Sequence, residues 1–184
     1  MVVIFVLLFV LFILPIFAVI FIYNRLVRYR NLVDEAFSQI DVLLTKRADL
    51  IPNLVETVRG YAAHERTVLE NVTASRASLM SAKGPGEKFR SSEELGAALK
   101  SLFAVAENYP NLKADQNFRS LQEQLSLIES EIAQTRMVYN QQVRNYNTVQ
   151  QTFPANMFAG TFGHQARAYY EVAVEKKEPP RVSF

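Results

Sequence analysis

The pair His64-Glu65 is the first feature of this chain that suggests chemistry. Such a pair begins the His-Glu-x-x-His motif, in which two histidines one helical turn apart bind zinc and the glutamate acts as a general base. Here Val68 stands where the second histidine would have to be. The motif is therefore incomplete, and we expect His64 to be a structural residue rather than a metal ligand.

The remaining residue patterns point away from catalysis as well. The second histidine, His164, lies far from His64 in the chain, and Tyr61 and Thr161 occupy the positions where di-iron helical bundles carry glutamate. Cysteine is absent, and so are the Gly-x-Ser-x-Gly nucleophile motif and the phosphate-binding loop. The sequence predicts no cofactor, no metal site and no enzymatic activity.

Glu65 and Arg76 are charged residues in an apolar context. On a helix with about 100° per residue, they lie within about 20° of each other and in the middle of an apolar stripe. The stripe consists of Leu54, Val58, Tyr61, Val68, Leu69, Val72 and Leu79. Since a buried charge without a partner costs several kcal/mol, we expect each to meet an opposite charge on a neighbouring helix.

A later helix offers candidate partners on one face: Glu129, Arg136, Asn140 and Asn147. We predict that Glu65 meets Arg136, Arg28 or Arg30, and that Arg76 meets Glu129 or Glu94. These residues would form a structural polar network that fixes the register of the helices. An alternative hypothesis makes Glu65 part of an active-site carboxylate pair.

Apolar residues recur every three or four positions, which predicts helices throughout. The expected helices cover residues 25–46, 49–82, 91–108 and 113–153. The second would begin with Asp49 as N-cap and Pro52 in its first turn, where a missing N–H is tolerated. The alternative is one long helix kinked at Pro52.

Residues 83–88 would form a loop, and Ser91 or Ser92 would cap the third helix, with Glu94 completing a capping box.

Four helices with one apolar stripe each must bury these stripes against one another. The predicted fold is therefore all-α, with a helical bundle over residues 25–153 and a C-terminal segment over 154–184. The helix at 113–153 would measure about 60 Å, but the first helix only about 35 Å beyond the membrane. A break near residues 145–147 or a staggered bundle would explain this mismatch.

Residues 1–24 carry no charged side chain, and Val2 to Tyr23 is an apolar run that contains Pro15. A helix over this run extends about 33 Å, which spans a hydrocarbon core of about 30 Å. A cleavable signal peptide would need a basic start, a shorter apolar core and a small-residue cleavage site, and these are missing. We therefore expect a retained single-pass transmembrane helix.

Arg25, Arg28 and Arg30 directly follow this run. The positive-inside rule then predicts an outer N-terminus and a cytoplasmic helical domain. The net charge of +2 is small, because positive and negative residues nearly balance, which argues against binding to nucleic acid.

At the C-terminus, prolines and charges predict a mobile tail. Pro180, Val182 and Phe184 could instead form a short docking peptide for a partner.

Several motifs in the chain resemble the LemA family of bacterial membrane-anchored proteins. They are VDEAFSQID at 33–41, DLIPNLVETV at 49–58, GYAAHE at 60–65 with the later Arg76, and ENYPNLKA at 107–114. In the last helix, the matching positions are Phe118, Leu121, Glu129, Arg136, Tyr139, Asn140, Tyr146, Asn147, Phe153 and Pro154. The resemblance covers residues 24–170. It departs at Phe37, where members usually have Trp, and at Ala48, where they have an aromatic residue.

The resemblance implies one N-terminal membrane helix, an up-and-down four-helix bundle of bromodomain-like topology and no known catalytic site. It also implies a bacterial inner-membrane location and, as a partner, an HtpX-like membrane metallopeptidase. Our first hypothesis is a non-enzymatic scaffold or adaptor that binds and regulates another membrane protein. The second is a structural protein that assembles into a homo-oligomer.

Overall fold

The computed structural model describes the backbone of residues 2–171 and the side chains of residues 9–171, and this part of the chain contains helices but no strand. The elements are α1 (Val2–Tyr61), α2 (Arg66–Ser81), α3 (Gly84–Ala106), α4 (Pro110–Ala114), α5 (Gln116–Gln151) and the 3₁₀ turn η1 (Ala155–Met157). The predicted all-α fold with a long apolar N-terminal helix is confirmed.

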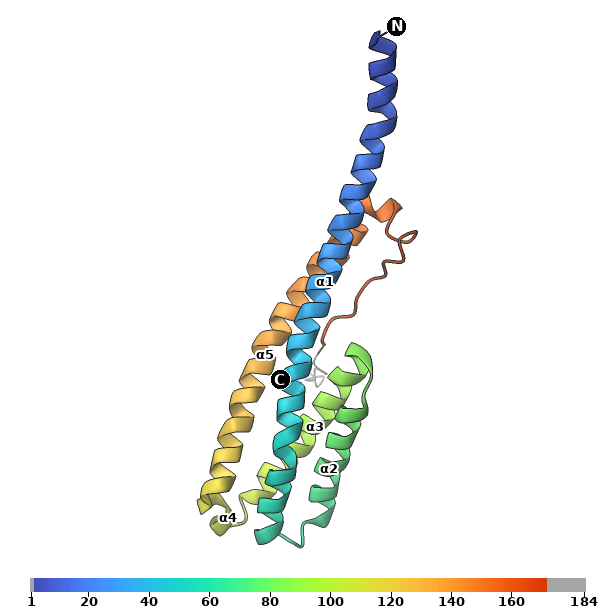
Figure 1. The fold of residues 1–184 in the computed structure, drawn as a ribbon. Helices are drawn as coiled ribbons and strands as arrows, with labels where there is room; N and C mark the ends of the chain where they lie inside the picture. The colour runs from blue at the N-terminus through green and yellow to red at the C-terminus, as the bar shows by residue number, and fades with distance from the viewer. Residues whose placement is uncertain (1, 172–184) are drawn as a thin grey trace, which may run out of the picture.

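The helices are arranged as a bundle with a long stalk (Figure 1). In the lower half, α1, α2, α3 and α5 run alternately down and up, and α4 joins α3 to α5 at the bottom. In the upper half, only α1 and α5 lie side by side, and the chain after η1 descends beside them. The largest fully buried side chains of the core are Tyr139, Tyr146, Leu26, Ile40, Leu44, Ile51, Leu54, Leu79, Leu95, Leu102 and Leu112.

Helix α1 does not end before Pro52, so the predicted helix start at Asp49 and Pro52 is wrong. Both residues are exposed inside one helix of 60 residues, as the single-helix alternative proposed. The continuity also removes the length mismatch. Residues 25–61 of α1 extend about 55 Å, and the 36 residues of α5 extend about 54 Å.

Arg76 explains how the helix tolerates Pro52. Proline has no N–H, so the carbonyl of Ala48, four residues earlier, lacks its donor within the helix. The Nε of Arg76, on α2, donates a hydrogen bond of 2.8 Å to this carbonyl. The predicted ion pair of Arg76 with Glu129 or Glu94 is therefore wrong, because its guanidinium compensates for a backbone group that the proline leaves without a donor.

The predicted start of the third helix is also wrong. Helix α3 begins at Gly84, inside the predicted loop, with Pro85 in its first turn and the Glu87 carboxylate accepting from the N–H of Lys83 at 2.8 Å. Ser91 and Ser92 are therefore buried within the helix rather than capping it. In the last helix, the cap is Asp115, whose carboxylate accepts from the N–H of Phe118 at 2.9 Å.

The N-terminal part of α1 has the exposure expected of a membrane segment. It is the one described helix that is long and apolar enough to cross a membrane. Phe9, Phe12, Phe17 and Phe21 each expose more than half of their surface. Such an unpartnered apolar helix suggests a single-pass membrane anchor. Pro15 lies inside the helix without ending it.

We expect Arg76 and Pro52 to be energetically coupled. Arg76→Met should destabilise the protein by about 1–3 kcal/mol, because the Ala48 carbonyl loses its donor. In a Pro52→Ala background, the new N–H of residue 52 can bind that carbonyl, so the same change should cost less. Chemical unfolding of the four variants in detergent, followed by circular dichroism, measures the coupling. Equal costs in both backgrounds would contradict this explanation of the continuous helix.

Candidate functional site

Glu65 lies in the turn between α1 and α2 rather than in the middle of an apolar helical face. It occupies the N-cap position of α2, is half-buried, and accepts a hydrogen bond of 2.9 Å from the hydroxyl of Tyr109. This bond raises the pKa of Tyr109. The predicted pairing of Glu65 with Arg136, Arg28 or Arg30 is wrong, because the helix turn at residues 62–65 changes the direction of its side chain. His64 is exposed in the same turn.

A second tyrosine–carboxylate contact closes this end of the bundle. The hydroxyl of Tyr61 donates to the carboxylate of Asp115 at 3.0 Å. The N–H of Phe118 and this hydroxyl together lower the pKa of Asp115, so the carboxylate stays charged. Tyr61 and Glu65 flank the turn after α1, and Tyr109 and Asp115 flank α4. The two contacts join the connections at the end farthest from the N-terminus.

Glu129 pairs with Arg47, a residue that the sequence analysis did not identify as part of the network. The Nη1 of Arg47 lies 3.0 Å from the Glu129 carboxylate, and the Arg47 side chain is only 7% exposed. Gly96 on α3 allows the close approach, since a Cβ there would lie 3.3 Å from Arg47 Nη2. Arg47 stands three residues after Leu44 and four before Ile51, so helical spacing could have placed it on the buried stripe.

Arg136 contacts an aromatic ring instead of Glu65. Its guanidinium lies 5.4 Å from the centre of the Tyr170 ring, and that ring stacks on Phe89 at 3.9 Å. Arg47, Glu129, Arg136 and Tyr170 all line a hollow of about 480 Å³ between α1, α3 and α5. Around this hollow, the Arg47–Glu129 pair joins α1 to α5, and the Arg136–Tyr170 contact joins α5 to the C-terminal segment.

Asn140 and Asn147 bind the backbone of an extended segment, residues 164–171, which we call the strap. The side chain of Asn140 donates to the carbonyl of Tyr170 at 3.0 Å and accepts from its N–H at 2.8 Å. Asn147 forms the same pair of bonds with Arg167, both at 2.9 Å. Each amide side chain thus satisfies both backbone groups of one strap residue.

The spacing of these two clamps follows from helix and strand geometry. Seven residues of α5 separate the asparagines, which corresponds to about 10.5 Å along a helix. Three residues separate their partners on the strap, which corresponds to about 10 Å in an extended chain. The two distances match, so both clamps can form at once and fix the register of the strap. Because the earlier asparagine binds the later strap residue, the strap runs antiparallel to α5 (Figure 1).

Further side chains of α5 hold the start and middle of the strap. Gln150 donates to the carbonyl of His164 at 2.8 Å, and the hydroxyl of Tyr139 donates to the carbonyl of Ala168 at 3.0 Å. The hydroxyl of Tyr146 lies 3.0 Å from Nδ1 of the buried His164. Burial, with a smaller contribution from the positive charge of Arg30, lowers the pKa of this histidine. His164 is therefore neutral at pH 7.

The described residues offer structural contacts rather than a catalytic arrangement. In this range, three or more His, Asp or Glu side chains nowhere gather as a metal site would require. The predicted polar residues do not form one network. Glu65 and Arg76 lie apart from the rest, Glu129 pairs with Arg47, and Arg136, Asn140 and Asn147 contact the strap. The two asparagines can recognise an extended peptide backbone. Pro180, Val182 and Phe184, the predicted docking residues, lie outside the described residues.

Replacing Asn147 by Asp should loosen the strap. The carboxylate can still accept from the N–H of Arg167, but it cannot donate to the carbonyl, and the lost bond costs about 1–3 kcal/mol. Hydrogen exchange should therefore become faster at the amides of Arg167 and Tyr170, with helix α5 unchanged. Asn145→Asp is the matched control, because Asn145 only accepts a bond from Gln141 on the same helix. Equal exchange in both variants would argue against the clamp.

Acid should also loosen the strap, through His164. Its pKa in the folded protein is lowered, so below about pH 6.5 the unfolded segment takes up a proton first. The contribution of His164 to stability is therefore complete above that pH and declines as the pH falls toward the lowered value. Exchange at Arg167, corrected for its intrinsic pH dependence, should rise as the pH falls below about 6.5. His164→Gln should remove this rise, and a rise that persists would assign it to another group.

Comparison with known proteins agrees with the resemblance seen in the motifs. The model of the LemA family matches residues 36–184. Protein LemA of Metamycoplasma hominis is 27% identical over 155 residues, which cover 82% of this chain and 67% of that protein. Magnetosome proteins MamQ 2 and MamQ 1 of Paramagnetospirillum magneticum are each 24% identical over 175 residues, which cover 81% of this chain and 64% of theirs.

The chain spans about two thirds of the length of these relatives. The family match covers the greater part of the chain, including the C-terminal part of α1, all of α2 to α5 and the strap. This chain belongs to the LemA family.

Proposed function

We propose that this protein is a non-enzymatic, membrane-anchored scaffold that presents a binding surface to another membrane protein. The observation that carries the proposal is the continuity of α1 from its apolar start to Tyr61. This continuous helix extends about 55 Å from the end of the charge-free segment to the far end of the bundle. It therefore sets the distance from the membrane, and the direction, of any binding surface on the bundle.

The orientation follows from the charges next to the anchor. Arg25, Arg28 and Arg30 lie on the bundle side of the apolar segment, which favours a cytoplasmic bundle and an outer N-terminus in a bacterial inner membrane. A partner in the same membrane is then confined to the same layer. Confinement raises its effective concentration at the scaffold without any additional contact.

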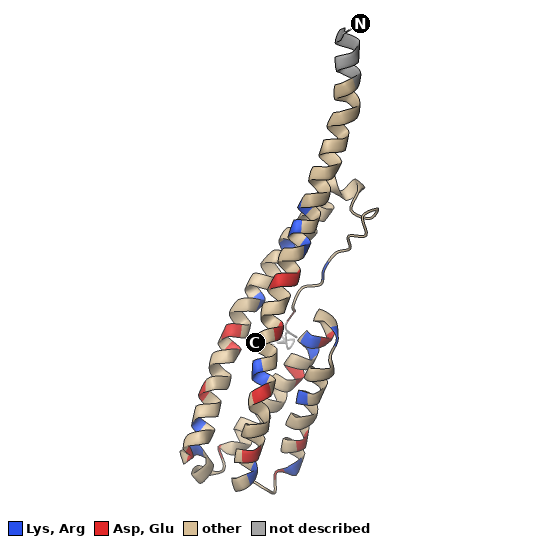
Figure 2. Ribbon diagram, viewed as in Figure 1, with Lys and Arg blue, Asp and Glu red and all other residues tan. Residues whose placement is uncertain are grey.

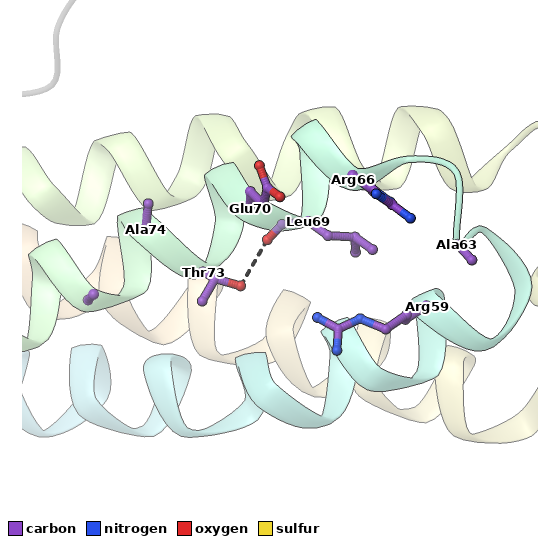
Figure 3. A pocket seen from close by; sticks show the side chains of 8 residues that line it. Arg59, Ala63, Arg66, Leu69, Glu70, Thr73 and Ala74 are labelled. Carbon is purple, nitrogen blue, oxygen red and sulfur yellow. Dashed lines mark hydrogen bonds between the residues drawn. The ribbon is translucent and has the colours of Figure 1, made fainter.

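The far end of the bundle carries a groove that suits such a partner (Figure 3). It measures about 760 Å³ and lies between the end of α1 and the start of α2. Arg59 from α1 and Arg66 from α2 stand on its opposite walls, and Leu69 lines it between them (Figure 3). The hydroxyl of Thr73 donates a hydrogen bond of 2.8 Å to the carbonyl of Leu69.

The groove therefore combines apolar surface with the positive charges of Arg59 and Arg66 and the negative charge of Glu70, so its net charge is positive. It favours a partner segment that carries both acidic and apolar residues. An HtpX-like membrane metallopeptidase, which the family resemblance suggests, is the first candidate partner. Self-assembly into a homo-oligomer is the alternative function, and it predicts that the groove contacts another copy of this chain.

A photo-reactive amino acid at Ala74, which lines the groove, should cross-link the partner in native membranes. The same group at the exposed Leu127 of α5 is the positional control. Mass spectrometry of the product from Ala74 should identify another membrane protein, and the Leu127 variant should lack that product. A product with twice the mass of this chain would favour self-assembly, and no product at either position would contradict the scaffold proposal.

Charge reversal then tests the role of the two arginines. Arg59→Glu with Arg66→Glu should reduce the cross-linking yield at Ala74 about tenfold or more, because opposed charges across an interface cost several kcal/mol. Lys83→Glu with Arg90→Glu is the matched control, since these residues are also exposed but do not line the groove. Equal loss in both double variants would indicate a general effect of charge rather than recognition at the groove.

A further inference from the structure

The segment between α5 and the strap has a composition unlike the rest of the bundle. Residues 145–166 contain no Lys, Arg, Asp or Glu. Within this stretch lies what we call the aromatic turn, residues 153–163, with the sequence FPANMFAGTFG. Its neighbour His164 is buried and has a lowered pKa, so it adds no charge at pH 7. The whole connection is therefore electrically neutral.

The aromatic turn is folded against α1 at one particular height. Its small residues Ala155 and Ala159 are buried with Ile22 and Leu26 of α1. The ring of Phe162 contacts the ring of Tyr23 edge-on, with 5.2 Å between their centres. The turn thus lies where the charge-free part of α1 ends, directly before the first arginine at position 25.

Large apolar side chains of the turn nevertheless point outward. Phe153 is 79% exposed and Met157 is 65% exposed. Phe158 and Phe162 are only half-buried, although they stack on each other. Burial of the two alanines fixes the backbone of the turn, so this exposure belongs to an ordered surface rather than to a frayed end.

The charges of the molecule end at the level of this turn (Figure 2). Lys, Arg, Asp and Glu are spread over the bundle below it, whereas the described part of α1 above it carries none. Water is a poor solvent for exposed Phe and Met, but the boundary between lipid headgroups and acyl chains accommodates such side chains. Aromatic residues such as Tyr23 and Phe162 are also typical of that boundary.

We propose that the aromatic turn is a second membrane contact, which inserts Phe153 and Met157 into the interfacial layer of the bilayer beside α1. The proposal rests on the membrane anchoring by α1 proposed above. A single transmembrane helix leaves the bundle free to rotate about the helix axis. Two contacts with the same membrane surface fix this rotation, and so fix which side of the bundle faces a neighbouring membrane protein. The turn therefore orients the scaffold, and the span attaches it.

The chain contains no tryptophan, so a single introduced Trp reports its own surroundings. The test uses the full chain in vesicles of phosphatidylcholine and phosphatidylglycerol, with bromine placed either high on the acyl chains or near their middle. Four single variants are compared: Met157→Trp and Phe153→Trp in the turn, Phe12→Trp in the span and Leu127→Trp on the exposed side of α5. All four positions expose more than 60% of their surface in the structure, so the substitutions need no repacking of the core.

The proposal expects quenching of both turn variants, strongest with bromine high on the chains, and a blue shift of their emission relative to Leu127→Trp. Phe12→Trp should be quenched most by bromine near the middle of the chains, and Leu127→Trp only by aqueous acrylamide. If the span variant is quenched but the turn variants respond to acrylamide alone, the second contact is refuted and the anchor stands.

Two other outcomes would also overturn the proposal. Shielding of the turn variants from both bromine and acrylamide would show that protein covers the turn, which points to a second copy or a partner helix. If Phe12→Trp itself escapes bromine, the anchoring by α1 fails, and the second contact fails with it. Far-ultraviolet circular dichroism of each variant checks that the helices remain intact.

Discussion

The carbonyl of Ala48 has no donor within its own helix, because the residue four positions later is Pro52. Arg76 reaches from α2 and donates to this carbonyl, so the helix continues where its local sequence favours an end. Much of the architecture depends on this one bond. With α1 continuous, its length beyond the apolar segment equals that of α5, and the two helices can pair from the anchor to the far end of the bundle.

The upper half of the molecule faces a different constraint. Only α1 and α5 extend there, and two helices leave part of their apolar stripes uncovered. The strap provides the missing third wall, but an extended chain brings backbone groups that need partners. Asn140 and Asn147 supply them in pairs. At its lower end, the strap joins the four-helix region through Tyr170, which lies between Phe89 and Arg136.

The positions of the polar residues on α5 were predictable, but their partners were not. The helical period places Glu129, Arg136, Asn140 and Asn147 near one face, and all four form contacts between segments. The period cannot reveal that the asparagines bind a backbone, because the strap has no repeat of its own to indicate its register. For Glu65, the helical wheel failed for a physical reason: the turn at 62–65 breaks the phase that the wheel assumed.

Local periodicity and composition are sufficient to establish the all-α class, the apolar N-terminal helix and the buried stripe of α5, since these features depend on neighbours within a few turns. Contacts between distant residues settled the rest. Pro52 lies inside a helix because Arg76, which is 28 positions after Ala48, donates a hydrogen bond to the Ala48 carbonyl. Likewise, Arg47 on α1 pairs with Glu129 on α5. The neutral turn at 153–163 acquires its place beside Ile22 and Tyr23 only when α5 has paired with α1 along its whole length.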